Sequence, residues 1–324
     1  MPPDRGAAAE SRAHMRYKVF SQVLAALFLS TACWGQSATA GTGQQSDTPT
    51  LRKNINLVNV FFTATDNHGA LVPNLSKDSF EVFEDGKPQT IKYFGAETNL
   101  PMTLGLLIDA SGNMERSLPS EKAAAGDFLR QIITDKGSIF VVSFDSSDGP
   151  TLEQGFTANI QRMRRAVERV MPEGRGSSGA PLFDAIYATA HEALGEQEGR
   201  KAMVILTDGV DVGSRLKLRD VIEAAQKADT ICYALLLSHP QHGSKVGDMR
   251  QLTEETGGRT IEVNRPDKIG AAFTQISNEL RNQYYIGYPP DNRKRDGSFR
   301  KIEIKTREPS YSIRARKGYY APRD

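Results

Sequence analysis

Apolar runs with the length and composition of β-strands alternate with helical segments between residues 100 and 282. The strand-like runs are rich in Val, Ile, Leu and Phe, and they cover residues 103–108, 138–144, 201–207 and 230–237. They are apolar throughout instead of alternating with polar residues, so both faces of the sheet that they form have to be covered. Strands that alternate with helices in this way predict an α/β domain, 100–282, with a doubly wound, mostly parallel sheet.

The helical segments between these runs carry their apolar residues on one face, which is the pattern of a helix packed on a sheet. Pro266 stands where the last of them begins, and Pro is favoured at the first position of a helix. We expect these helices to cover the two faces of the sheet. The apolar residues of three of them are Ala125, Phe128, Leu129, Ile132 and Ile133, then Leu218, Val221, Ile222 and Ala225, and finally Ile269, Phe273, Ile276 and Leu280.

Two shorter β segments flank this domain, at residues 51–99 and 283–324. In the first, a strand-like run is followed by the turn pair Asp85-Gly86, which predicts a hairpin whose return strand covers residues 90–94. In the second, apolar and charged residues alternate, as in Ile302 and its neighbours. Each segment alone is too small for a stable core. We therefore expect the two ends of the chain to pack together, or on the α/β domain, as one β-module.

The first 40 residues have the composition of an export signal. Basic residues precede the apolar run 23–29, and a small-x-small cleavage pattern ends at Ala40. Translation from Met15 instead of Met1 would leave this signal complete. Residues 41–50 form a Gly/Ser/Thr/Gln-rich linker. The prediction is a secreted or periplasmic protein, with lipid anchoring at Cys33 as the alternative.

Charge and hydropathy narrow the class of protein further. Without residues 1–40 the chain has 37 basic and 37 acidic residues, so no overall charge attracts it to nucleic acid. The C-terminal segment 283–324 carries a local surplus of six positive charges, typical of a solvated strand face, with an anionic cell-surface contact as the alternative.

Beyond the signal, no stretch is long and apolar enough to span a membrane. Cys232 lies in an apolar run and is predicted to be buried.

Acidic residues follow two of the predicted parallel strands. Asp109 ends the first strand, within Asp109-Ala110-Ser111-Gly112-Asn113, and Asp208 follows the third. The carboxyl ends of parallel strands meet at one edge of a sheet, where ligands bind in open α/β folds. Either Asp alone is equally typical of a turn or a helix cap. Together with the hydroxyl of Ser111 and the amide oxygen of Asn113, they predict a site for a hard cation such as Mg²⁺.

These motifs resemble the metal-ion-dependent adhesion site of von Willebrand factor type A (VWA) domains. The resemblance implies a Mg²⁺ or Mn²⁺ ion held by an Asp-x-Ser-x-Ser loop, a distant Thr and a distant Asp, with a carboxylate of a protein partner completing the shell. The segments 80–89, 284–288 and 316–320 resemble an exported bacterial subgroup, the VWFA-related proteins. Carried over residue by residue, the implied metal ligands are Asp109, Ser111, Asn113 and Asp208.

The sequence departs from the family pattern at two positions. Asn113 stands where the second Ser of the loop is expected, and it offers an amide oxygen instead. Ala180 stands where the Thr ligand is expected, and its methyl group offers nothing. Ser177, Ser178 or a water molecule would have to fill that role. We assign Ser177, Ser178 and Gly209 to the rim of the site.

Motifs for common enzyme classes are missing from the sequence. The Gly/Ser-rich stretch 174–179 lacks the Gly-Lys-Ser/Thr ending of a phosphate-binding loop, and no HExxH motif occurs. The prediction is therefore a non-enzymatic binding or adhesion protein that recognises a protein partner. The alternatives are a structural envelope protein with a vestigial metal site, and a metal-dependent hydrolase in which Asp109 and Asp208 hold the ion.

Overall fold

The computed structural model describes residues 57–96, 101–132, 137–173, 179–237 and 246–324. The predicted signal peptide (1–40), the linker (41–50) and Cys33 therefore lie outside the described residues. Among the helices of the described ranges, none is long and apolar enough to cross a membrane.

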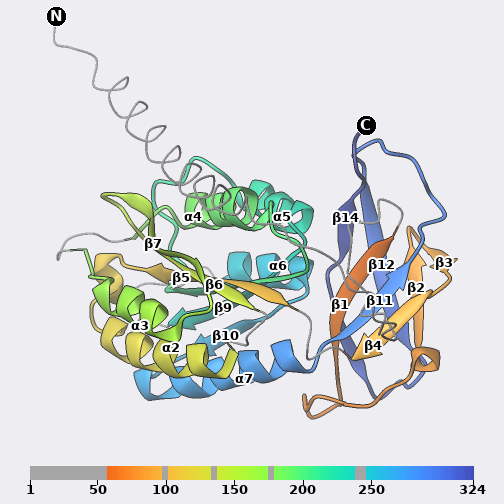
Figure 1. The fold of residues 1–324 in the computed structure, drawn as a ribbon, viewed down its shortest axis with the longest axis horizontal. Helices are drawn as coiled ribbons and strands as arrows, with labels where there is room; N and C mark the ends of the chain where they lie inside the picture. Colours follow the sequence, from red (N-terminus) through yellow and green to blue (C-terminus); the bar gives the residue numbers. More distant parts are fainter. Residues whose placement is uncertain (1–56, 97–100, 133–136, 174–178, 238–245) are drawn as a thin grey trace, which may run out of the picture. The chain divides into compact units, whose positions relative to one another are not determined.

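A six-stranded sheet forms the centre of the α/β domain (Figure 1). Its strand order is β10-β9-β8-β5-β6-β7, and every neighbouring pair is parallel except β6 and β7. The prediction of a doubly wound, mostly parallel sheet is thus confirmed. The strands are β5 (Met102–Asp109), β6 (Ser138–Asp145), β7 (Gly149–Thr157), β8 (Arg200–Thr207), β9 (Thr230–Leu237) and β10 (Thr260–Val263).

Two of these strands, β7 and β10, carry no continuous apolar run and were not predicted. Both lie at an edge of the sheet. All nine residues of β7 are partly or fully exposed, and in β10 only Val263 is buried. An edge strand has a neighbour on one side only, so its side chains need not be apolar on both faces.

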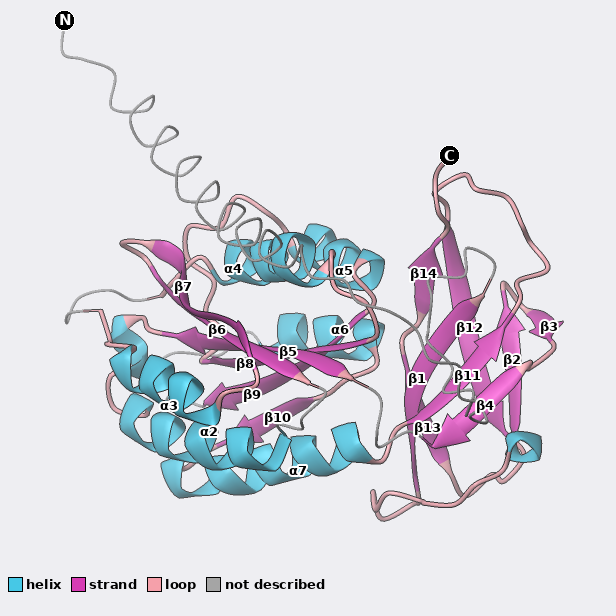
Figure 2. Cartoon of the chain, viewed as in Figure 1, coloured by secondary structure: helices cyan, strands magenta, loops and turns pink. Residues whose placement is uncertain are grey.

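Helices cover both faces of the sheet (Figure 2). On one face, α2 contacts α3 and α7, and the rings of Phe128 and Phe273 stack with their centroids 4.7 Å apart. On the other face, α5 contacts α4 and α6. Cys232 is buried in the core, as predicted. The helices are α2 (Leu118–Ile132), α3 (Ile160–Arg169), α4 (Leu182–Ala188), α5 (Leu218–Lys227), α6 (Val246–Thr256) and α7 (Ile269–Arg281), with a π-helical turn at Thr189–Leu194 and 3-10 turns at Lys77–Ser79, Gly112–Met114 and Pro266–Lys268.

The flanking segments form two four-stranded sheets, in the orders β13-β1-β11-β4 and β14-β12-β2-β3. Each sheet interleaves strands from the two ends of the chain, so β1 lies between β13 and β11, and β2 lies between β12 and β3. The rings of Phe62, Phe80 and Tyr284 pack in the shared core. The predicted β-module is confirmed. Its strands are β1 (Val58–Thr65), β2 (Phe80–Glu84), β3 (Lys87–Gln89), β4 (Tyr93–Ala96), β11 (Tyr284–Tyr288), β12 (Phe299–Thr306), β13 (Ser312–Ala315) and β14 (Gly318–Tyr320).

The hairpin at Asp85-Gly86 is present, but its return strand was predicted wrongly. Both turn residues have positive φ, 49° and 78°, as the tight two-residue turn requires. The chain then pairs at once through β3, whereas Tyr93 and Phe94 belong to β4 and pair with β11 in the other sheet. Ile91 and Phe94 pack against the shared core where the chain crosses from one sheet to the other.

Candidate functional site

The site lies where the order of the strands in the central sheet reverses. From β5 the chain moves outward through β6 and β7, and β8 returns to the other side of β5 before β9 and β10 follow. Ile108 on β5 is opposite Leu206 on β8, so Asp109 and Asp208 both stand at the carboxyl edge. This is the position at which open α/β sheets bind ligands.

Asp109 is fully buried at the end of β5. Its Oδ1 accepts a hydrogen bond of 2.9 Å from the Ser111 amide, and its Oδ2 accepts one of 2.7 Å from Thr207 Oγ1. Burial raises the pKa of Asp109 to about 6; the hydrogen bonds oppose this shift, and the neighbouring charge of Asp208 adds to it. A carboxylate with a raised pKa in a buried site gains from any cation placed beside it.

Asp208 is held from two directions just after β8. Its Oδ1 accepts a hydrogen bond of 2.9 Å from the Val210 amide, and its Oδ2 accepts one of 2.8 Å from Asn113 Nδ2. Gly209, assigned to the rim, has a φ of 79° and donates its amide to Thr207 Oγ1 at 3.0 Å. Asn113 is thus hydrogen-bonded to Asp208, and Asp208 lies close enough to Asp109 for its charge to raise the pKa of Asp109.

Ser111 completes the predicted group. Its hydroxyl is close enough to Asp109 to lower the pKa of that carboxyl. It is nevertheless fully buried, and within the described part of the chain no group meets it with hydrogen-bond geometry. Buried hydroxyls are nearly always paired, so a buried hydroxyl beside a carboxylate is a natural ligand position for a cation.

Ala180 is fully buried and pairs with Asp211 in an isolated parallel bridge. Its carbonyl oxygen accepts hydrogen bonds from the amides of Val212 and Leu182, at 2.9 and 2.8 Å. The backbone of this segment is thereby fixed to the loop that follows Asp208, while the side chain contributes only a methyl group. Ser177 and Ser178, the other rim residues, lie outside the described residues.

Comparison with known proteins identifies the domain. Residues 104–210 match the sequence model of the von Willebrand factor type A domain. The chain therefore contains a VWA domain. This match begins within β5 and ends just after Asp208, so it includes the four predicted metal ligands. No curated protein matches the sequence significantly.

Several solved structures are similar to parts of this chain at low sequence identity. The conserved hypothetical protein BatB from Bacteroides thetaiotaomicron is 15% identical over 56% of this chain and 99% of its own, with a TM-score of 0.44. A von Willebrand factor type A protein from Catenulispora acidiphila is 12% identical over 84% of this chain and 75% of its own, with a TM-score of 0.48. The vWF domain of the type V pili tip protein Mfa5 from Porphyromonas gingivalis is 11% identical over 56% and 95%, with a TM-score of 0.45.

Two residues near the VWA site were not identified from the sequence. Thr207 connects Asp109 to the loop after β8 through its hydroxyl. Glu121, in the first turn of α2, is 1% exposed, and neither of its carboxyl oxygens has a hydrogen-bond partner among the described residues. Burial, reinforced by the charge of Asp109, raises the pKa of Glu121 to about 8, against a smaller lowering by Ser117. Its position in the sequence could have indicated that it is buried, because Glu121 lies on the same helical face as the apolar Ala125.

The donor atoms of the site suit a hard cation. Carboxylate oxygens of Asp109 and Asp208 and the hydroxyl of Ser111 are the ligand types that Mg²⁺ and Mn²⁺ favour. Among the described residues, no three His, Cys, Asp or Glu side chains are grouped to hold a metal by themselves. A cation in this VWA domain would therefore also need hydroxyl, amide and water oxygens as ligands. Ser111 and Asn113 are the side chains that would supply the hydroxyl and amide oxygens.

Proposed function

We propose that the protein is an exported binding protein that recognises a protein partner at the carboxyl edge of its VWA sheet. In this proposal Asp109, Ser111, Asn113 and Asp208 hold a divalent cation, Mg²⁺ or Mn²⁺. The supporting observation is the buried Ser111 hydroxyl, which has no partner in the described structure and lies beside a carboxyl group of raised pKa. A carboxylate supplied by the partner would complete the shell of the ion.

Electrostatics at this edge support the role of a cation. The charge of Asp208 adds to the raised pKa of Asp109, and the charge of Asp109 in turn adds to the raised pKa of Glu121. Burial removes the water that would otherwise screen these groups. A divalent ion would offset this repulsion and would pair the vacant hydroxyl of Ser111. The same ion would retain an attraction for one further carboxylate, which is the chemistry proposed for the partner.

A structural role without metal is the second candidate, and one contact favours it. The side-chain amide of Asn113 donates a hydrogen bond to the Asp208 carboxylate. This hydrogen bond stabilises the negative charge that a cation would otherwise neutralise. The methyl group of Ala180 leaves the Thr position without an oxygen. In such an envelope protein the site would fold and hold its shape without an ion. Direct titration with metal separates the two candidates.

The test uses purified wild-type protein together with Asp109→Ala and Asp208→Ala. We expect Mn²⁺ to raise the melting temperature of the wild type, because an ion that binds only the folded state stabilises it. Both variants should lose this response. Asp78→Ala, which removes an exposed carboxyl group in the β-module, is the matched control and should respond like the wild type. A wild type that does not respond to millimolar Mn²⁺ would rule out the metal site.

Partner recognition is tested separately, by capture from envelope extract with and without chelator. Proteins retained by the wild type and by Asp78→Ala, but lost with chelator and with Asp208→Ala, would support the proposal. Equal capture by the wild type, Asp78→Ala and Asp208→Ala would show that binding uses another surface.

Intact-mass analysis of exported protein tests the predicted cleavage after Ala40. A lipid on Cys33 would instead establish the anchored alternative.

A further inference from the structure

A cavity of about 710 Å³ lies away from the metal-ligand candidates. It is bounded by the start of β1, the end of α5 and the segment from Pro289 to Pro322 in the C-terminal part of the β-module. This volume is in the range of pockets that bind small molecules. Proline and tyrosine side chains form part of its wall, including Pro290 and Tyr320.

Positive charge predominates around this cavity. Six basic side chains line it, with one carboxylate, Asp229, among the lining residues. Carboxylates that are not lining residues pair with three of the six: Glu84 with Arg300, Glu223 with Lys227, and Asp324 with Arg295. Counting all of these groups leaves a surplus of two positive charges. The six basic residues are Lys227, Arg293, Lys294, Arg295, Arg300 and Arg316.

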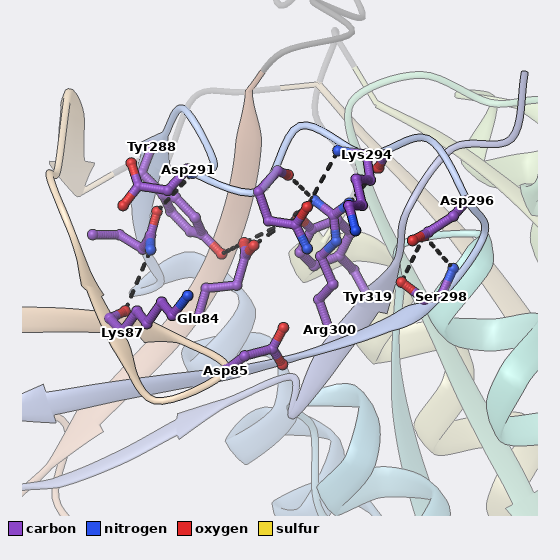
Figure 3. Close-up of polar contacts among 12 residues, drawn as sticks. Glu84, Asp85, Lys87, Tyr288, Asp291, Lys294, Asp296, Ser298, Arg300 and Tyr319 are labelled. Carbon is purple, nitrogen blue, oxygen red and sulfur yellow. Dashed lines mark hydrogen bonds and ion pairs between the residues drawn. The ribbon is translucent and has the colours of Figure 1, made fainter.

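Arg300 forms the most deeply buried basic wall of the cavity, with 2% of its side chain exposed. Its two terminal nitrogens donate to the carbonyl oxygens of Asn292 and Lys294, and Nη1 also reaches the Tyr319 hydroxyl at 3.2 Å (Figure 3). Its nearest carboxylate oxygen, on Glu84, is 3.8 Å away. The Nε atom of Arg300 is buried and has no partner among the described residues.

Glu84 is itself engaged by other donors. Its Oε2 accepts hydrogen bonds of 3.0 Å from the hydroxyls of both Tyr288 and Tyr319 (Figure 3). Burial raises the pKa of Tyr319 to about 12 and that of Tyr288 still further, so both hydroxyls remain protonated donors at physiological pH. The negative charge of Glu84 is thus shared among three side chains, so it neutralises the charge of Arg300 only in part.

Arg316 provides a second guanidinium group at the same cavity. It donates to Asp229 Oδ1 at 2.5 Å and to the carbonyl oxygen of Asn59 at 2.6 Å, while its Nε is also buried without a partner in the described structure. At the rim, Arg293 and Lys294 are exposed, and neither side chain forms an ion pair with a described residue. Two largely buried guanidinium groups, and two exposed cations that form no ion pair with a described residue, therefore line one cavity.

We propose that this cavity binds a small molecule that carries two or more oxyanion groups, phosphate or carboxylate. Arg binds both groups through paired N–H donors, and a buried guanidinium group binds them more strongly than an exposed one. Two anionic groups match the surplus of two positive charges, and the Pro and Tyr walls contact the body that joins them. This site shares no residue with Asp109 or Asp208, so it does not depend on the function proposed above.

Pyrophosphate and citrate are the probes for this proposal. Each is titrated calorimetrically into the wild-type protein at constant ionic strength, in buffers stripped of divalent ions on a chelating resin. Under these conditions the probes cannot act by binding a metal at the VWA site. We expect saturable binding of at least one probe; pyrophosphate alone would indicate phosphate groups, and citrate alone would indicate carboxylate groups. Binding of neither probe at millimolar concentration would overturn the proposal.

The double variant Arg293→Ala/Lys294→Ala locates the binding. Both residues are exposed, so the fold should be retained, and affinity for the probe should fall about tenfold or more. Arg162→Ala/Arg165→Ala removes the same net charge from exposed positions on α3 and should bind like the wild type. An equal loss in both double variants would show that the probes respond only to net charge, and would contradict a specific site. Circular dichroism verifies that each variant is folded.

Discussion

The side-chain amide of Asn113 donates a 2.8 Å hydrogen bond to Asp208 Oδ2 and so connects the loop after β5 to the loop after β8. In the VWA pattern a serine stands at position 113, and a cation brings the two loops together. Here one amide hydrogen bond spans the same gap. This contact stabilises the metal-free site, and it would compete with a cation for the Asp208 oxygen.

Replacing Asn113 with Ser is expected to lower the stability of the metal-free protein and to raise its affinity for a metal ion. The variant loses a hydrogen bond to a charged acceptor, so the metal-free protein should be destabilised by about 1–2 kcal/mol. Asp208 Oδ2 then becomes available to an ion, and the Ser hydroxyl restores the ligand of the family pattern. Calorimetric titration should show tighter Mn²⁺ binding by Asn113→Ser than by the wild type. An unchanged affinity would mean that the amide does not compete with the ion.

Ala180→Thr tests whether the vacant Thr position is part of the site. Because Ala180 is fully buried, the larger side chain should destabilise the fold by about 1–3 kcal/mol through overpacking. Ala180→Val has nearly the same shape without the hydroxyl, and it is the matched control. We expect Ala180→Thr to bind Mn²⁺ about tenfold more tightly than Ala180→Val, a difference of about 1.4 kcal/mol. Equal affinities would place Ala180 outside the coordination shell.

Glu121 should make the stability of the protein depend on pH. Its folded-state pKa of about 8 lies above its ordinary value of 4.5, so the protonated form is favoured in the folded protein. Its contribution to stability is complete below pH 4.5 and is lost as the pH rises through 8. In the range between, the folded protein binds more protons than the unfolded chain, and unfolding free energy should fall with increasing pH by an amount on the order of a few kcal/mol.

The variant Glu121→Gln removes this titration and retains the shape of the side chain. Relative to the wild type, its unfolding free energy should rise steadily from pH 5 to pH 8.5. Asp109, with a pKa raised to about 6, titrates in both proteins, so the comparison isolates the titration of Glu121 together with its interaction with Asp109. Denaturant unfolding in metal-free buffer at several pH values measures the difference. A constant difference between the two proteins over this range would show that Glu121 is already ionised in the folded state.

The core of the fold and the ends of two strands could be predicted from the sequence because burial restricts residue type. Each predicted apolar run became a central strand, and Asp109, Ser111, Asn113 and Asp208 were placed together by the topology that those runs imply. The edge strands β7 and β10 were not predicted, because an edge strand has a neighbour on one side only and its residues need not all be apolar. Glu121 was missed for the opposite reason. A buried charged residue departs from the periodic pattern and is hidden among the polar residues of an amphipathic helix.

Glu279 links the VWA domain to the β-module through two ion pairs. Its carboxyl group, 3% exposed on α7, accepts from Arg259 and from Arg314 on β13, each at 2.8 Å. Glu279→Gln leaves two guanidinium groups without a counter-charge, and it should destabilise the protein by about 2–3 kcal/mol. Loss of one partner of a fully buried pair costs about 3–5 kcal/mol, but both arginines are partly solvated here. Glu262→Gln, which breaks the exposed pair with Arg250, should lower stability by less than about 1 kcal/mol. Similar losses in the two variants would contradict this role for Glu279.

The two ends of the chain should be unable to fold apart, because β11 occupies the middle of a sheet between β1 and β4. Ending the chain at Asn282 removes β11 to β14. Val60 and Phe62, both fully buried, would then lose their cover, and Phe80 and Val82 would lose β12 beside them. Exposure of a large apolar side chain costs about 1.5–3 kcal/mol, so four such residues outweigh the stability expected of the remaining strands. We expect chain 41–282 to be insoluble or to melt without cooperativity, whereas chain 41–324 melts cooperatively. Calorimetry of both forms measures this, and a shortened chain with the melting profile of the longer one would show that β1 to β4 fold without the C-terminal strands.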